Sequence, residues 1–467
     1  MRGYIILMGI FVWVPILLLK PHVGVLVWDW VSHMNPHRTA ANIKDLPILD
    51  LIAGLTIIGL FISKEPRRIP AHPIIVTILI YFLWTVITTM LAYDPVFSSG
   101  KLTHLFKIVL FVLITTIVMQ SPIRLKAYYW VMALSVGFFA IKGGLFSIVT
   151  GGMGRVQGGG GMLNDNNQLA MVLSMMVPVA YYLYLHPPFK IMKWPMFGSI
   201  FITIASVIGT QSRGGLIAVA AVSGMLFMNM KHKLAIIAVT IPLALVGYQM
   251  LPDRLKDRYA TIDSAAEEDA SFRGRVAMWK YGVNVTDDYP IAGGGFDNNY
   301  IKPMQDRYLP YGFTPKAFHS VYFEVLGEHG YTGLILFLTI AFTAWYSAGT
   351  IYKQLKDHKD LLWLADMART LKLSVLAYCV GGLTVNIATL DLFYDICGLI
   401  ALTSIVGNKI LAARTTVTTT FNPYAVKEAH KFYEEQQKDI KKEKDPKNPF
   451  GLKKKKQKKK WSPHDPQ

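Results

Sequence analysis

Charged residues and cysteine are both scarce in this chain of 467 residues. Charged side chains make up 17% of the sequence, against roughly 25% in soluble domains, while hydrophobic residues make up 52%. The two cysteines, Cys379 and Cys397, lie in apolar runs, so neither a disulfide framework nor a zinc knuckle is available. These shortages exclude a soluble enzyme, a disordered chain and a secreted disulfide scaffold.

Nucleotide-binding and metal-binding motifs are missing as well. The sequence contains no P-loop, no Rossmann glycine fingerprint and no HExxH motif, and Gly293-Gly-Gly295 is a turn signal only. No external acidic or histidine cluster has a convincing metal spacing, so we expect neither a metal nor another cofactor. An internal repeat or a symmetry of two halves, common in transporters, is also lacking.

Long apolar runs dominate what is present, and their lengths suit helices that cross a bilayer. The first 31 residues cross either once, with a re-entrant piece, or twice. We therefore predict an all-α polytopic membrane protein with 12 or 13 transmembrane helices. Apart from those first residues, the predicted spans are 45–63, 73–92, 101–119, 128–150, 167–185, 194–210, 214–230, 234–250, 331–352, 373–390 and 393–411.

Basic residues in alternate short loops give the orientation, because Lys and Arg favour the cytoplasmic side. This rule places the C-terminus in the cytoplasm and one large loop, 251–330, in the periplasm. A loop of this length between two spans usually carries function. We divide the chain into an N-terminal transmembrane bundle (1–250), the periplasmic loop (251–330), C-terminal transmembrane helices (331–411) and a basic tail (412–467).

The tail contains 15 Lys or Arg residues against 7 Asp or Glu residues. Such a run is typical of a disordered, solvated cytoplasmic segment, and contact with anionic lipid headgroups is its functional alternative. Nucleic-acid binding is not expected of a protein embedded in a membrane.

Several cations lie on the external side, against the orientation rule. A charge at membrane depth usually faces a cavity or a partner rather than lipid. Together they indicate a polyanion bound at the outer surface, such as a lipid-linked pyrophosphate, since the guanidinium fork matches phosphate oxygens. For each alone, snorkelling or pairing with Asp50, Asp165 or Asp391 is the alternative. The cations are Lys101, His104, Lys107, Lys142, Arg155, Arg213, Arg273 and Arg275.

His319 is a second signal, in a short helix-like run before the span 331–352. A histidine near the membrane surface can remove a proton from an acceptor hydroxyl; a hydrogen-bonded interfacial histidine is the alternative. Glu324 lies about 140° around the helix from His319, so a simple relay between them is not supported. Tyr322 is a candidate for contact with sugar or with His319, and an interfacial tyrosine is the alternative.

Several short motifs in order resemble the O-antigen ligase/polymerase superfamily over residues 1–411. They include Asn164-Asp-Asn-Asn167, Ser212-Arg-Gly-Gly215, Arg275-Val-Ala-Met-Trp279 and His319-Ser-Val-Tyr322. The segments Trp28-Asp-Trp-Val-Ser-His-Met-Asn-Pro-His-Arg38 and Ile141-Lys-Gly-Gly-Leu-Phe146 resemble one subgroup, the O-glycosylation ligases associated with exosortase A systems.

The resemblance implies a bacterial inner-membrane glycosyltransferase, independent of metal and nucleotide, with a site facing the periplasm. It would move a glycan from undecaprenyl pyrophosphate to an acceptor hydroxyl of lipopolysaccharide core or another O-linked acceptor. By position, Arg213 and Arg275 would hold the pyrophosphate and His319 would activate the acceptor. We include as candidate substrate-binding residues Arg273, Arg155, Lys142, Lys107, Tyr322 and Asn167.

Three other functions remain open. A polymerase or a protein O-oligosaccharyltransferase of the same superfamily would share the donor site and differ only in the acceptor. A polysaccharide flippase would instead predict short loops and paired halves.

Overall fold

The structure is a computed structural model that describes residues 2–39, 43, 45–65, 67–158, 165–228, 270–419 and 434. The chain forms two compact units, residues 1–407 and 408–467. The predicted span 234–250, residues 251–269 of the predicted loop and nearly all of the predicted tail beyond residue 419 lie outside the described residues. The same holds for Asn164.

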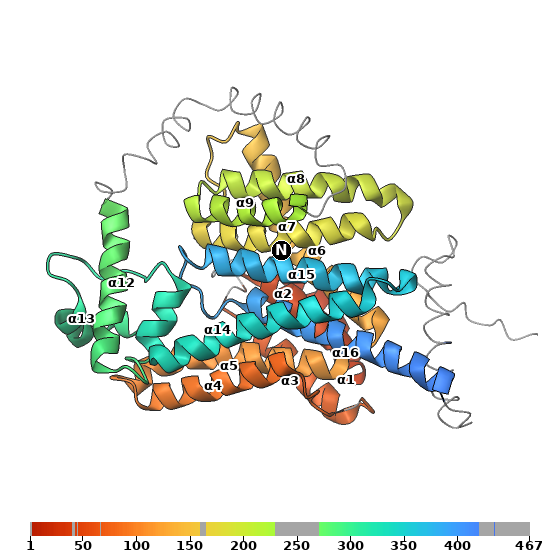
Figure 1. Cartoon of the computed structure of the whole chain (residues 1–467), viewed down its shortest axis with the longest axis horizontal. Coiled ribbons are helices and arrows are strands. Elements are labelled where there is room, and N and C mark those ends of the chain that lie inside the picture. Colours follow the sequence, from red (N-terminus) through yellow and green to blue (C-terminus); the bar gives the residue numbers. More distant parts are fainter. Residues whose placement is uncertain are drawn as a thin grey trace, which may run out of the picture. The chain divides into compact units, whose positions relative to one another are not determined.

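Every described element is helical, as the apolar runs predict, and no strand occurs among the described residues (Figure 1). The N-terminal helices are α1 (Arg2–Leu19), α2 (Pro21–Met34), η1 (Pro36–Thr39), α3 (Ile48–Ile62), α4 (Pro73–Met90), α5 (Pro95–Val118), α6 (Pro122–Val149), α7 (Asn166–Leu185), η3 (Lys190–Met192), α8 (Lys193–Gly209) and α9 (Arg213–Met228). The others are α12 (Ala270–Asp288), η4 (Asn298–Tyr300), α13 (Lys302–Tyr308), α14 (Val321–Leu355), η5 (Lys359–Leu361), α15 (Leu362–Gly381) and α16 (Asp391–Thr419).

Proline and capping side chains fix where several of these helices begin. Both α5 and α6 have proline at the first turn, where a missing N–H costs no hydrogen bond. The carboxylate of Asp94 accepts from the backbone N–H of Phe97 at 2.9 Å, and the hydroxyl of Ser121 accepts from that of Arg124 at 3.3 Å. Each bond satisfies a donor that the helix itself leaves open.

Seven helices in the described part of the chain are long and apolar enough to cross a membrane. They match seven of the predicted spans in position, and α3 and α9 are shorter apolar helices at two more. The first residues form two helices, α1 and α2, joined at Lys20. The total of 12 or 13 crossings stays a prediction.

The predicted span 373–390 is wrong in its bounds. Helix α15 begins at Leu362 and ends at Gly381, and residues 382–390 are not helical. The charged side chains of its first turns, which misled the hydropathy pattern, are neutralised locally. Asp366 lies 2.9 Å from His186 and 3.1 Å from Arg369. Paired charges near a helix end do not stop the helix.

Helix α14 contains a break that separates a short helix from a long one. Gly330 has a φ of 67° and a ψ of −170°, which a residue with a side chain adopts only with strain. The backbone of Tyr331 there donates to the carbonyl of Pro290 at 2.9 Å. The short run before the long span, expected from the sequence, is therefore a helix in its own right, but it begins only at Val321. His319, which the sequence analysis placed in this run, lies in the turn before it, so the predicted helical angle between His319 and Glu324 does not apply.

Helices α7, α15 and α16 form the interior of the bundle, and α14 packs against α4 and α15 (Figure 1). In α7, 78% of the apolar window is buried inside the protein, against 17% for the segment that contains α8. The core therefore centres on α7, and α8 exposes its aromatic side chains. The N-terminal ends of α7, α9 and α14 frame the candidate site.

Candidate functional site

The segment before α14 is held by a small core of its own. Helices α12 and α13 pack their apolar faces together, and Trp279 stacks on Phe323 with ring centroids 5.1 Å apart. The indole of Trp279 donates to the carbonyl of Phe318 at 3.0 Å. This fixes the chain one residue before His319. The buried core residues are Met278, Tyr281, Val285, Met304, Tyr308 and Phe318.

His319 is half-buried and has a φ of 50°, in the left-handed region that non-glycine residues seldom adopt. Such conformations persist only where the surroundings enforce them, and they cluster at functional sites. Here the backbone N–H of Val321 donates to the carbonyl of Gly382 at 2.8 Å. The hydroxyl of Tyr322 donates to the carbonyl of Cys379 at 2.6 Å. The end of α15 thus holds the strained turn.

The positive charge of Arg275, on α12, influences the protonation of His319. Burial lowers the pKa of His319 below its usual value, and the positive charge of Arg275 lowers this pKa further. The half-buried Arg275 and the exposed Arg273 are two residues apart, so they leave the helix about 200° apart.

Arg213 is exposed at the first position of α9, after a turn that the start of α7 holds. The side chain of Asn166 donates to the carbonyl of Thr210 at 2.9 Å, and the hydroxyl of Ser212 donates to the side-chain oxygen of Asn167 at 2.8 Å. Asn167, a candidate substrate ligand, therefore positions the arginine turn.

The turn after α15, residues 382–384, contacts both the start of α9, which carries Arg213, and the start of α14, next to His319. A Cβ on Gly214 would collide with Thr384, so the start of α9 packs directly on this turn. Gly382 on the same turn binds the start of α14. The charge of Asp165, which caps α7, also acts on His319. The structure thus brings the starts of α7, α9 and α14 to one end of the bundle, next to Arg275.

The remaining candidates differ in how closely they adjoin this end. The loop that carries the exposed Arg155 is attached to it, because the N–H of Val156 donates to the carbonyl of Gly209 at 2.8 Å. Lys107 instead lies 2.6 Å from Asp50, the pairing that the sequence left as its alternative. Lys142 is exposed on α6, and no contact described here joins it to the others.

Lys101 does not belong among cations that face a substrate. Its ammonium lies 2.7 Å from both Glu324 and Glu328 and 3.3 Å from Asp297, within the protein. This corrects its place in the external cation set, since three carboxylates already surround it. His104 likewise lies 3.5 Å from Asp391. The spacing of Glu324 and Glu328, one helical turn apart, was the signal that could have revealed the network.

These features define a multi-pass helical membrane protein with a cationic, histidine-bearing site at one end of its bundle. The family described as O-antigen ligase matches residues 198–338, and a family of unknown function (DUF5935) matches residues 1–187. No curated protein matches the chain. The first match contains Arg213, Arg275 and His319, and it supports the O-antigen ligase/polymerase superfamily.

Proposed function

We propose that this protein is an O-antigen ligase-type glycosyltransferase of a bacterial inner membrane. It moves a glycan from undecaprenyl pyrophosphate to an acceptor hydroxyl at the periplasmic face. The observation that carries this proposal is the meeting of α9 and α14 on the turn 382–384, beside α12. That meeting places Arg213, Arg275 and His319 at one end of the bundle, within the segment that matches O-antigen ligases.

The donor's diphosphate suits the start of α9. A helix N-terminus offers backbone N–H groups and a partial positive charge to anions, and Arg213 adds a full charge at that point. Arg275 supplies a second guanidinium from α12. As the glycosidic bond breaks, negative charge grows on the diphosphate, and both arginines stabilise it. Arg155 and Arg273 are secondary contacts in this proposal, with Lys107 and Lys142 further out.

His319 takes the acceptor proton. The acceptor oxygen forms a bond to the anomeric carbon while the bond from that carbon to the phosphate oxygen breaks. The electron pair of the broken bond leaves with undecaprenyl diphosphate, and the hydroxyl proton passes to a ring nitrogen of His319. A lowered pKa keeps the imidazole neutral, and thus able to accept a proton, near pH 7. The reaction requires no nucleotide or catalytic metal.

The acceptor distinguishes the related functions. Transfer to lipopolysaccharide core is ligation, transfer to a protein hydroxyl is protein O-glycosylation, and transfer to another lipid-linked unit is polymerisation. All three use the same donor site, and the link with exosortase A systems rests on the N-terminal motifs alone. A flippase is the more distant alternative, because it needs no histidine beside the arginines.

Glycan transfer by the purified full chain in detergent tests the proposal. The assay contains undecaprenyl-pyrophosphate glycan and, in parallel, lipopolysaccharide core, a serine-rich peptide or a second lipid-linked unit, with no added ATP. We expect transfer to one of these acceptors, with strong loss in Arg213→Ala. Arg307→Ala is the matched control, because Arg307 lies on α13 and pairs with Asp288 at 2.6 Å. Retained activity in Arg213→Ala would overturn the donor site, and binding without transfer to any acceptor would favour a flippase.

A further inference from the structure

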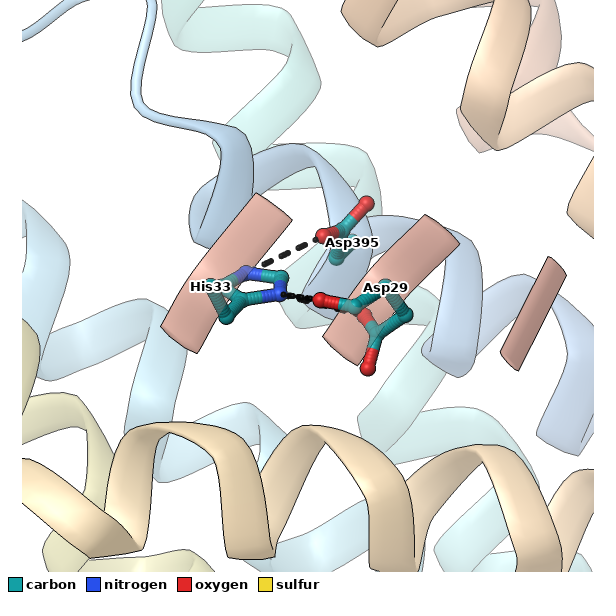
Figure 2. Close-up of side chains that lie close together, drawn as sticks. All are labelled: Asp29, His33 and Asp395. Atoms are coloured by element: carbon teal, nitrogen blue, oxygen red, sulfur yellow. Dashed lines mark hydrogen bonds and ion pairs between the residues drawn. The ribbon is translucent and has the colours of Figure 1, made fainter. Parts of the chain in front are cut away.

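A cluster of charged side chains lies buried between α2 and α16. Asp29 is 0% exposed, His33 is 7% exposed and Asp395 is 2% exposed. Figure 2 shows His33 beside the two carboxylates, with a dashed line from its ring to each of them. Nδ1 of His33 is 3.2 Å from an oxygen of Asp29, and Nε2 is 3.3 Å from an oxygen of Asp395. No part of the proposed transfer uses these residues.

Helical spacing explains why these side chains meet. Asp29 and His33 are four residues apart on α2, and Asp391 and Asp395 are four apart on α16, so each pair shares one face of its helix. One ligand atom from each of Asp29, His33 and Asp395 lies within 4.8 Å of the others. Two ligands of a tetrahedral zinc ion, each about 2.0–2.2 Å from it, are about 3.4 Å apart.

The hydrogen bonds within the cluster leave it short of positive charge. Neither carboxylate oxygen of Asp29, nor Oδ1 of Asp395, has a hydrogen-bond partner among the described residues, and the same is true of Nε2 of His33. With both carboxylates ionised, even a protonated histidine leaves one net negative charge in a buried place, which is costly. A divalent cation bound by two carboxylates and a neutral histidine brings the total to zero.

The histidine is also oriented as a ligand. Its Nδ1 lies 3.1 Å from the backbone carbonyl of Asp29, the kind of partner that fixes the tautomer of metal-binding histidines. With the proton on Nδ1, the lone pair of Nε2 faces the carboxylate of Asp395. Two lone pairs 3.3 Å apart repel each other unless a cation lies between them.

Polar groups continue from the cluster toward the surface. The hydroxyl of Ser32 donates to Asp391 at 2.9 Å, and Nε2 of His104 lies 3.5 Å from the other oxygen of Asp391. Asp391 is 28% exposed and His104 is 40% exposed. Asp391, one helical turn before Asp395 on α16, thus carries polar contacts from the end of the cluster to partly exposed side chains.

We propose that Asp29, His33 and Asp395 bind one divalent transition-metal ion, with zinc the best match to one imidazole and two carboxylates. The ion joins α2 to α16 and stabilises the bundle; it takes no part in the transfer. Two residues of the site come from the Trp28–Arg38 motif, within the segment that matches the family of unknown function.

Metal content of the full chain tests this site. The protein is purified in detergent without a polyhistidine tag, stripped with a chelator, and titrated with Zn²⁺, with Mn²⁺ and Mg²⁺ in parallel. We expect one Zn²⁺ per chain, with binding weakened at least about 10-fold in His33→Gln and in Asp395→Asn. Asp366→Asn is the matched control, because Asp366 forms a similar pair with His186 at 2.9 Å outside the cluster.

Thermal unfolding provides a second readout in case a variant folds poorly. Added Zn²⁺ should raise the melting temperature of the wild type and of Asp366→Asn, and should leave that of Asp395→Asn unchanged. A stripped wild type that binds no Zn²⁺ would overturn the proposal and identify His33 as a protonated bridge between the two carboxylates. Equal Zn²⁺ binding by wild type and His33→Gln would overturn it as well.

Discussion

The first turns of α14 and the turn just before it hold charged side chains in opposite ways, one side enclosed in the protein and the other open. Glu324 and Glu328 point into the protein, where both contact Lys101 and are almost fully buried. His319, just before the helix, is half-buried and lies near the positive charges of Arg275 and Lys316, with the negative charge of Asp165 partly opposing them. A cation enclosed by carboxylates is part of the fold. Cations gathered around a partly open histidine suit an anionic substrate.

The largest expected effect is on the open side. His319→Ala should lower kcat/KM for glycan transfer by about 10²- to 10⁴-fold, since a general base contributes about that much. The measurement is the transfer assay in detergent, with His358→Ala as the control, because His358 is exposed after α14. The melting temperature should stay the same. Wild-type transfer by His319→Ala would remove the base assignment.

On the enclosed side, removal of the charge of Lys101 should lower the stability of the protein. Lys101→Met leaves Glu324 and Glu328 buried without their cation, and breaking a buried ion pair costs about 3–5 kcal/mol. We expect a large drop in melting temperature in detergent. Adding Glu324→Gln and Glu328→Gln to the same variant should restore part of it. If Lys101→Met alone unfolded at the wild-type temperature, the network would not be an anchor.

Arg275 and Arg273 form a matched pair for the donor site. Arg275→Gln should lower kcat/KM by about 10- to 100-fold, the effect of losing one to two charged hydrogen bonds. Arg273→Gln should change it only slightly, since Arg273 is exposed and leaves α12 on the opposite side. The same assay with limiting donor measures both. An equal loss in the two variants would contradict the distinction between them.

The pH profile sharpens the role of Arg275. The neutral form of His319 is the active one, and its pKa is lowered by burial and then by Arg275. The acidic limb of kcat/KM should therefore fall below the usual histidine value of about 6.5. In Arg275→Gln, one lowering influence is gone, so the limb should move to higher pH. If the acidic limb stayed at the same pH in Arg275→Gln, Arg275 would not influence the pKa of His319.

The smallest effect is expected at Lys107. Lys107 already pairs with Asp50 at 2.6 Å, so we do not expect it to hold the donor as well. Lys107→Ala and Asp50→Ala should both keep transfer close to that of the wild type. A selective loss of donor affinity in Lys107→Ala alone would return this lysine to the substrate site.

Much of the local structure follows from the sequence. Apolar runs long enough to cross a bilayer predict helices, and the boundary predicted at Gly330 is confirmed. Helices α5 and α6 instead begin at Pro95 and Pro122, before the predicted starts at 101 and 128. Helix α15 also begins earlier than predicted, among charged residues whose partners lie on other turns and helices. Hydropathy treats each charge as solvated, so it cannot register Asp366 pairing with His186.

Only part of the candidate site could be predicted from the sequence. Short motifs indicated Arg213, Arg275 and His319, because the residue types that bind diphosphate and accept protons are few. Which cations are already neutralised depends on residues more than 200 positions away, as with Lys101 and Glu324.

The sequence by itself determined the helical membrane class and the residues with suitable chemistry, because length, hydropathy and side-chain type are local properties. Only the tertiary structure decided which charges meet. It buried Lys101 among carboxylates, placed His33 between Asp29 and Asp395, and brought the starts of α9 and α14 to one turn. Electrostatic free energy depends on distance and burial, and both are set by packing between helices far apart in the chain.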